Sequence, residues 1–124
     1  MKVIKLNDCE EIIAGDKTLL REIFNPLKER LEINYSLARA LILPGTSSQP
    51  HSLEAVEVFY IIRGKGEMHI ADEVQVVEPG DTIYIPANAV QWIDNKFNEP
   101  LEFLALVEPS WNKKIEHVNE SKTS

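Results

Sequence analysis

Two stretches decide the fold of this chain: GTSSQPHSLEAVEVFYIIRG, residues 45–64, and GDTIYIPANAVQWIDN, residues 80–95. Each begins at a glycine and contains a proline, and these two residue types interrupt strands and form turns. The residues between the breaks are rich in β-branched and aromatic side chains, with polar side chains at intervals, which is typical of short strands. Both stretches therefore predict strands that place a few polar side chains inside a β-barrel.

The same pattern of short apolar runs and turns continues on both sides of these stretches. Turns recur about every ten residues, as they do in a β-sandwich or a closed barrel. We therefore predict an all-β domain. The expected strands lie in residues 33–43, 56–63, 67–70, 74–77, 82–85, 90–95 and 101–107.

The chain has 124 residues, which suits a single domain. We expect the barrel in residues 31–110, preceded by a segment, residues 1–30, that packs on the barrel or on a partner. Residues 17–24 in that segment form either a strand or a short helix. Residues 111–124 are expected to be a polar tail that begins with a helical turn.

The charge of the chain limits its partners. Twenty acidic and 13 basic residues give a formal net charge of −7, which disfavours nucleic acid and anionic membrane surfaces. No apolar run approaches membrane-spanning length, and the N-terminus lacks the apolar core of a signal peptide. We therefore expect a cytoplasmic protein. Cys9 is the only cysteine, so a disulfide within the chain is excluded.

Polar residues on one strand face predict a site for chemistry. In an extended strand alternate side chains share a face, so His51, Leu53 and Glu57 point the same way, and the face continues through Phe59. An unpaired buried carboxylate is costly, so Glu57 needs a cation, a metal or a protonated partner. Imidazole nitrogen and carboxylate oxygen are good ligands for a divalent transition metal, and Gln91 adds a weaker amide oxygen. We predict a weak metal site at His51, Glu57 and Gln91.

Other residues extend this pocket or offer simpler interpretations. Arg39 lies within an apolar run, so it either projects into the pocket to bind an anionic group or lies at an interface. We predict that Arg39, Leu53 and Phe59 line the pocket. Glu57 could instead pair with Arg39 or Lys65 in a salt bridge.

The remaining polar candidates are less tied to the pocket. His51 is alternatively a loop histidine bonded to the backbone, and Gln91 is alternatively a hydrogen-bonding pocket wall. His69 is expected to face solvent or a partner subunit, because it is out of phase with its apolar neighbours. His117 lies in the polar tail and is expected to be unrelated to the site.

The two stretches resemble the cupin family, which folds as a double-stranded β-helix, or jelly-roll, barrel. The first cupin motif has a glycine, two histidines, a glutamate and a second glycine. The second has a glycine, a proline, a glycine, a histidine and an asparagine. The matching residues are Gly45, His51, Leu53, Glu57 and Gly64 in the first motif, and Gly80, Pro86, Asn88, Gln91 and Asn95 in the second.

The chain departs from the cupin motifs at three positions. Leu53 replaces a histidine and cannot bind a metal, and Gln91 replaces the histidine of the second motif. Asn88 replaces a glycine, and asparagine tolerates the positive φ that a turn needs there. The resemblance implies a metal in the barrel mouth, bound by the positions that remain.

Two classes of function follow. The first is a metal-dependent enzyme acting on a polar organic acid or sugar, with manganese, iron, nickel or zinc as its metal. In a metal-free form of this enzyme, His51 would be a general base oriented by Glu57. The second is a non-catalytic barrel that binds or senses a small molecule without metal. We also expect a two-fold homodimer, with residues 1–6 as an edge strand.

Overall fold

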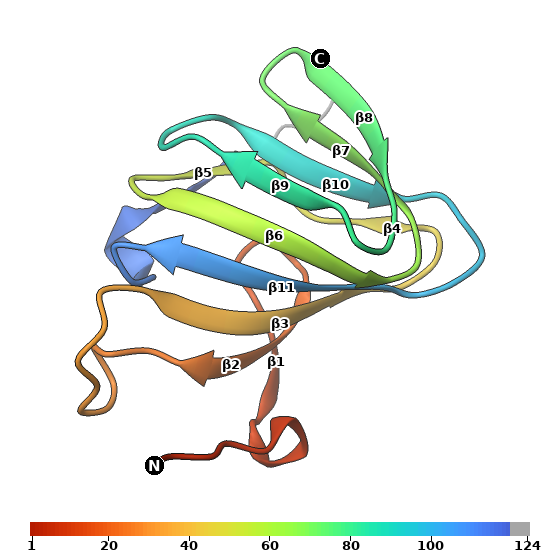
Figure 1. Cartoon of the computed structure of the whole chain (residues 1–124). Helices are drawn as coiled ribbons and strands as arrows, with labels where there is room; N and C mark the ends of the chain where they lie inside the picture. The colour runs from red at the N-terminus through yellow and green to blue at the C-terminus, as the bar shows by residue number, and fades with distance from the viewer. Residues whose placement is uncertain (120–124) are drawn as a thin grey trace.

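The computed structural model of the chain describes residues 1–119 and contains two antiparallel sheets that face each other (Figure 1). One sheet has the strand order β1-β2-β3-β11-β6-β9. The other has the order β12-β5-β10-β7-β8, with the short β4 also paired to β10. The prediction of an all-β domain is therefore confirmed.

Twelve strands and two short 3-10 helices make up the described part of the chain. The helices η1 and η2 lie near its two ends. The elements are η1 (Leu6–Asp8), β1 (Glu11–Ile13), β2 (Leu19–Phe24), β3 (Ser36–Ile42), β4 (Thr46–Ser47), β5 (His51–Leu53), β6 (Val56–Arg63), β7 (Gly66–Ile70), β8 (Glu73–Val77), β9 (Thr82–Ile85), β10 (Gln91–Asn95), β11 (Leu101–Glu108), η2 (Lys113–Ile115) and β12 (Glu116–Val118).

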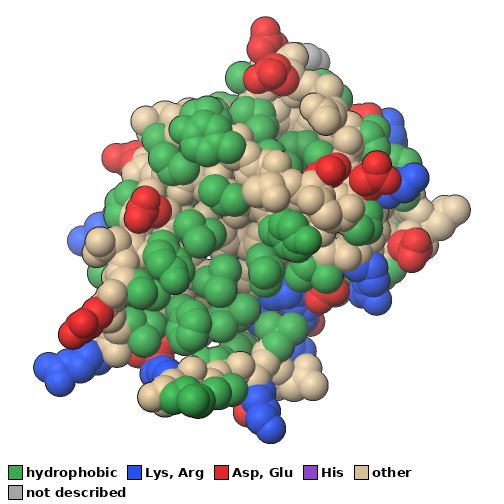
Figure 2. Space-filling view, viewed as in Figure 1, with side chains coloured by type: hydrophobic (Ala, Val, Ile, Leu, Met, Phe, Trp, Pro, Cys, Tyr) green, Lys and Arg blue, Asp and Glu red, His purple; other side chains and the backbone are tan. Residues whose placement is uncertain are grey.

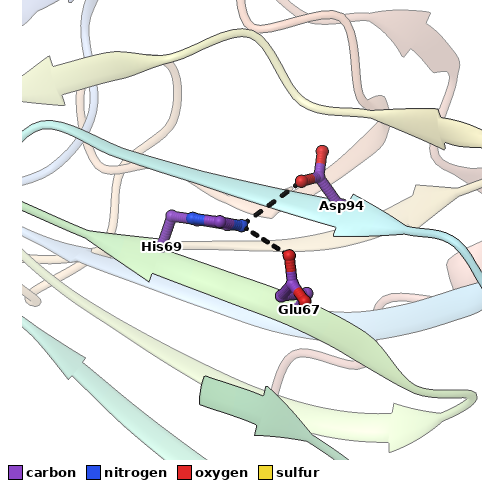
Figure 3. A group of neighbouring side chains, drawn as sticks. All are labelled: Glu67, His69 and Asp94. Carbon is purple, nitrogen blue, oxygen red and sulfur yellow. Dashed lines mark hydrogen bonds and ion pairs between the residues drawn. The ribbon is translucent and has the colours of Figure 1, made fainter. Parts of the chain in front are cut away.

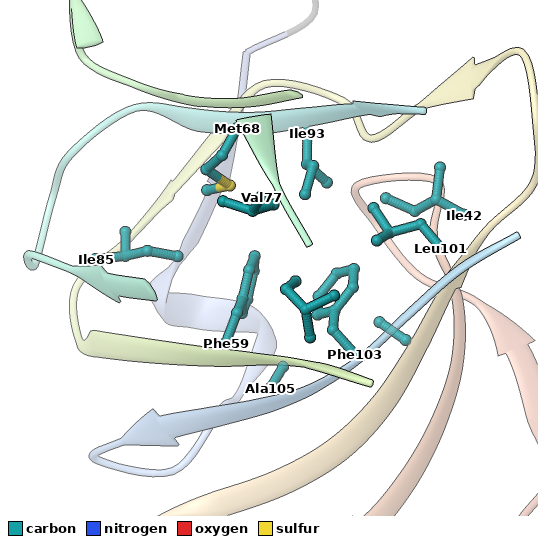
Figure 4. Close-up of a cluster of buried hydrophobic side chains, with 11 residues drawn as sticks. Ile42, Phe59, Met68, Val77, Ile85, Ile93, Leu101, Phe103 and Ala105 are labelled. Atoms are coloured by element: carbon teal, nitrogen blue, oxygen red, sulfur yellow. The ribbon is translucent and has the colours of Figure 1, made fainter. Parts of the chain in front are cut away.

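The hydrophobic core lies between the two sheets. Phe59 and Phe103 project from β6 and β11, and their ring centroids are 4.4 Å apart with planes tilted by 39°. Met68, Val77 and Ile93 project toward them from the opposite sheet (Figure 4). Burial of these apolar side chains holds the two sheets together and fixes which face of each strand points inward.

Two turn positions show why the motif residues are needed. Gly64 has a φ of +79°, and a Cβ atom there would collide with the carbonyl oxygen of Pro100, so only glycine fits. Asn88 has a φ of +68°. The expectation that asparagine takes the positive φ of the motif glycine is confirmed.

Segments near both ends of the described residues belong to the sheets, namely β1, β2 and β12. For residues 17–24 both a strand and a short helix were considered, and the structure has a strand, β2, at residues 19–24. Residues 1–5 form no strand, and the edge of this sheet is β1 instead.

Within the segment expected to be a polar tail, residues 116–118 form β12, which pairs with β5, and residues 120–124 lie outside the described residues. The polar composition does not indicate this strand, because Glu116 turns into a cavity while Lys114 and His117 stay exposed. The helical turn expected there is confirmed as η2.

Candidate functional site

A cavity of about 880 Å³ lies where the barrel meets the two chain ends. Its walls come from β1 and the turn after it, from β2 and β3, from the motif strands β5 and β6, from β11, and from β12 with the segment that leads into it. Its polar lining includes both predicted and unpredicted residues. They are Glu10, Asp16, Thr18, Glu22, Lys28, Ser36, His51, Glu57, Lys113 and Glu116.

His51 presents a free lone pair to this cavity. The residue begins β5 and is only 3% exposed. Its Nδ1 atom lies 3.0 Å from the carbonyl oxygen of Gln49. Because a carbonyl oxygen only accepts hydrogen bonds, Nδ1 carries the proton and donates it, which leaves the lone pair of the neutral ring on Nε2. Nε2 lies 3.7 Å from Oδ2 of Asp16. Metal-binding and basic histidines are commonly held in this way.

Glu57 is a buried carboxyl group beside this imidazole. Gln91 donates a hydrogen bond from Nε2 to Oε1 of Glu57 over 2.6 Å. The pKa of Glu57 is raised from 4.5 to about 7, with burial as the largest cause and the carboxylates of Asp16 and Glu116 acting in the same direction. The Gln91 hydrogen bond, and His51 when it is protonated, lower the pKa of Glu57 but do not offset burial. Near neutral pH this carboxyl group therefore exchanges a proton readily and favours a nearby cation.

Asp16 and Glu116 are site residues that the sequence analysis missed. Asp16 follows β1, and its Oδ1 accepts hydrogen bonds from the backbone and hydroxyl of Thr18, so that Oδ2 is left to face His51. Glu116 belongs to β12, and burial raises its pKa. A Cβ atom on Gly15 would lie 2.8 Å from Oε1 of Glu116, so the glycine makes room for this carboxylate. The Gly-Asp pair predicts a turn, but no local signal shows what the turn faces.

The predicted pocket residues have three different locations. Leu53 lines the cavity and packs with Val107 and Trp111. Phe59 is 4% exposed and lies in the core between the sheets. Arg39 alternates with inward-facing alanines, so it lies on the outer face of its sheet, where its guanidinium approaches Glu11 at 3.5 Å and Glu102 at 3.7 Å. Arg39 and Phe59 do not belong to the cavity wall that residues 1–119 form.

A second cluster of possible ligands lies on the outer face of β7 and β10. Nε2 of His69 is 3.0 Å from Oε1 of Glu67 and 3.3 Å from Oδ2 of Asp94 (Figure 3). Trp92 stacks on His69, with ring centroids 4.4 Å apart and planes within 9° of parallel. The ligand atoms of Glu67, His69 and Asp94 all lie within 4.8 Å of one another. From the sequence, His69 was expected to face solvent or a partner subunit, and no ligand cluster was predicted around it.

The comparisons with known proteins fit the two motifs. A family model described as a cupin domain matches residues 38–107. The chain belongs to the cupin family, and the predicted double-stranded β-helix barrel is confirmed. The solved structure of the polyketide cyclase RemF from Streptomyces resistomycificus superposes with a TM-score of 0.79 at 19% identity, and the match covers 100% of this chain and 87% of that one.

Two curated relatives are similar in sequence. An uncharacterized protein of Methanocaldococcus jannaschii is 32% identical over 115 residues, which cover 90% of this chain and 91% of that protein. An oxalate-binding protein of Thermotoga maritima is 32% identical over 71 residues, which cover 56% of this chain and 59% of that protein. Within residues 1–119, no helix is long and apolar enough to cross a membrane.

Proposed function

We propose that this cupin binds a small polar molecule in the cavity beside His51 and that a divalent transition metal is held there by His51 and Glu57. The observation that carries the proposal is the fixed tautomer of His51. Its Nδ1 proton is donated to Gln49, and its Nε2 lone pair faces the cavity beside the buried Glu57. The proposal does not depend on the two motif histidines that Leu53 and Gln91 replace in this chain.

The kinds of donor atom in the cavity suit such a metal, although among the described residues only Glu67, His69 and Asp94 bring three possible ligand atoms within 4.8 Å of one another. An imidazole nitrogen with carboxylate oxygens suits manganese, iron, nickel or zinc. Asp16 supports the set because its Oδ2 faces the same nitrogen of His51. Gln91 was predicted as a third ligand, and its amide nitrogen instead donates to Glu57. A hydrogen bond of this kind orients a metal-binding carboxylate, and a direct role for the Gln91 oxygen stays a prediction. When bound, the metal would act as a Lewis acid.

The charges around the cavity restrict the ligand. Five carboxylates line it against two lysines, and one of these, Lys28, already pairs with Glu22 at 2.8 Å. Such a wall repels small organic anions and favours neutral polyhydroxylated molecules such as sugars. A bound divalent cation would make the electrostatic potential near it positive instead of negative. We therefore propose that the metal-free cavity takes a sugar-like ligand and that an acid such as oxalate, the ligand named for the Thermotoga relative, binds only with metal.

The test measures metal and oxalate together. The full chain is stripped with EDTA, dialysed against manganese, iron, nickel or zinc, and analysed for metal per chain. Calorimetry then measures oxalate binding with and without metal. We expect one equivalent of metal in the cavity, which is lost in His51→Ala and in Glu57→Ala, and we expect oxalate to bind only to the loaded protein. Glu73→Gln, an exposed carboxylate on β8, is the matched control.

Two results would contradict this proposal. One is a His51→Ala variant that keeps the full metal content of the unaltered chain. The other is oxalate affinity that is the same with and without metal, because the carboxylates would then have no effect on anion binding.

A non-catalytic barrel that binds its ligand without metal is the second candidate. Glu57 favours it, because a pKa of about 7 lets a proton neutralise the buried carboxylate instead of a metal. Leu53 favours it as well, since it places an apolar wall where the family motif has an imidazole. In that case the stripped protein binds sugars, and metal does not change their affinity.

We further propose that the chain forms the two-fold homodimer predicted above. Apolar side chains spread over the outer face of the β3-β11-β6-β9 strands (Figure 2). Tyr60, Ile62 and Tyr84 on this face are 47%, 43% and 64% exposed. An exposed apolar patch of this kind favours association with a second copy. Light scattering that returns the chain mass of 14.1 kDa would contradict the dimer.

A further inference from the structure

The Glu67–His69–Asp94 cluster lies outside the cavity described above. Met68 and Ile93 point into the core, so their neighbours on β7 and β10 point to the opposite side of the sheet. Asp94 is the cross-strand partner of Glu67, and Trp92 is the cross-strand partner of His69. The cluster is therefore held by the pairing of two strands rather than by a loop.

The distances in the cluster suit a metal ion better than a set of hydrogen bonds. Nε2 of His69 can carry only one proton. It faces two carboxylate oxygens, one of Glu67 at 3.0 Å and one of Asp94 at 3.3 Å. A neutral His69 has at most one N–H group at Nε2 to share between these two oxygens. Ligands about 2.0–2.2 Å from a tetrahedral ion lie roughly 3.3–3.6 Å from one another. The two separations from His69 Nε2 need to change by only a few tenths of an ångström to surround such an ion, and the two carboxylate oxygens lie within 4.8 Å of each other.

The surroundings of the cluster hold its ligands in place. The Trp92 ring lies flat against the imidazole of His69 and fixes its plane. Lys96 pairs with Oε2 of Glu67, which orients Oε1 toward His69. The three ligand side chains are between 16% and 27% exposed, so water can reach a fourth coordination position.

We propose that Glu67, His69 and Asp94 form a second metal site, on the outer face of β7 and β10, that binds zinc or a similar first-row divalent ion. The donor set of one imidazole and two carboxylates is suited to such ions and compensates their charge. Because the ligands come from two neighbouring strands, the ion cross-links β7 to β10 and binds only the folded chain. Its role is structural, and it does not require a ligand or a metal in the cavity.

The test is a zinc titration of the EDTA-stripped full chain, with stoichiometry read by a competing chromophoric chelator. His69→Phe keeps a flat ring against Trp92 but removes the nitrogen ligand, and Asp94→Asn is a second variant that removes a carboxylate. Glu73→Gln is the control, because it removes a carboxylate from the same sheet outside the cluster. We expect each cluster variant to lose one equivalent of zinc that Glu73→Gln and His51→Ala both keep. We also expect a hundredfold excess of zinc over Kd to raise Tm by on the order of 10 °C through this site.

The outcomes separate this site from the cavity. If the cavity binds no metal, the unaltered chain binds one zinc, and His69→Phe binds none. If His69→Phe and Asp94→Asn both bind as much zinc as the unaltered chain, the proposal is overturned. A His51→Ala chain that binds no zinc also overturns it. Should His69→Phe fail to fold by circular dichroism, Asp94→Asn decides.

Discussion

His51 and His69 lie in the same sheet, on β5 and β7, but the sheet gives them opposite environments. His51 is almost fully buried, and its Nδ1 is bonded to a backbone carbonyl. His69 lies on the outer face, and its Nε2 is shared between two carboxylates. The buried site is costly to charge, whereas the outer site has solvent and Lys96 to moderate its charge. Similar donor types therefore favour a proton or a weakly held metal inside and a structural ion outside.

The largest effect that we expect concerns the buried carboxyl group. The folded chain binds the Glu57 proton more tightly than the unfolded chain, because the folded pKa is about 7 against 4.5. Its contribution to stability is thus fully present below pH 4.5 and is lost as the pH rises through about 7. The loss amounts to about 3 kcal/mol for the metal-free chain. Urea denaturation at several pH values measures it.

The comparison variant for this prediction is Glu57→Gln, which has no charge to bury. It should lose less stability between pH 5 and pH 8 than the unaltered chain, roughly by the amount above. A smaller slope should remain from Glu116, whose pKa is raised in the same direction. Parallel stability curves for the two chains would show that Glu57 is not desolvated as the structure indicates.

A second prediction makes the inner site resemble a stronger metal site. The double variant Leu53→His with Gln91→His adds two imidazoles to the cavity beside His51. Because imidazole is a better ligand for transition metals than an amide oxygen or no ligand, metal affinity in the cavity should rise by about tenfold or more. Competition with a chelator measures the change. The same gain should appear when the double variant is made in a His69→Phe chain, which lacks a ligand of the outer site. An unchanged metal affinity would mean that positions 53 and 91 do not converge on His51.

The smallest expected effect concerns the aromatic support of the outer site. Trp92→Leu removes the ring that lies against His69. We expect zinc to bind the outer site a few-fold more weakly, by about 1 kcal/mol, because the imidazole is less well oriented. Tyr84→Leu is a suitable control, since it removes an exposed aromatic ring from the other sheet. Equal zinc affinity in both variants would show that Trp92 does not contribute to zinc binding at the outer site.

The two motif stretches, residues 45–64 and 80–95, made the barrel predictable because the residue types that form turns can be recognised in a sequence. Gly64 and Asn88 have the positive φ values that their residue types allow, and they fix where strands begin and end. The strands that these two stretches form place Gln91 beside Glu57, although the two residues are 34 positions apart in the chain. Spacing between turn residues therefore predicted one contact of the candidate site.

Other parts of the site left no local mark. Asp16 and Glu116 reach the cavity because β1 pairs with β2 and β12 pairs with β5. These pairings depend on tertiary packing rather than on a periodic sequence pattern. Arg39 was assigned to the wrong face because β3 is apolar on both sides. Leu37 and Leu41 share its outer face, while Ala40 and Ile42 face the core. Alternation in such a strand cannot show which face the barrel buries.

The cavity walls also have a consequence for how ligand occupancy can be observed. Residues near both ends of the described chain, among them Ile12 and Val118, line the same space. A molecule that fills this space contacts both segments at once and hinders their separate opening. Amide hydrogen exchange in β1 and β12 should therefore slow together on binding, while exchange in β8, which is remote from the cavity, stays the same. The exchange rates of these terminal strands thus report occupancy without a label on the ligand.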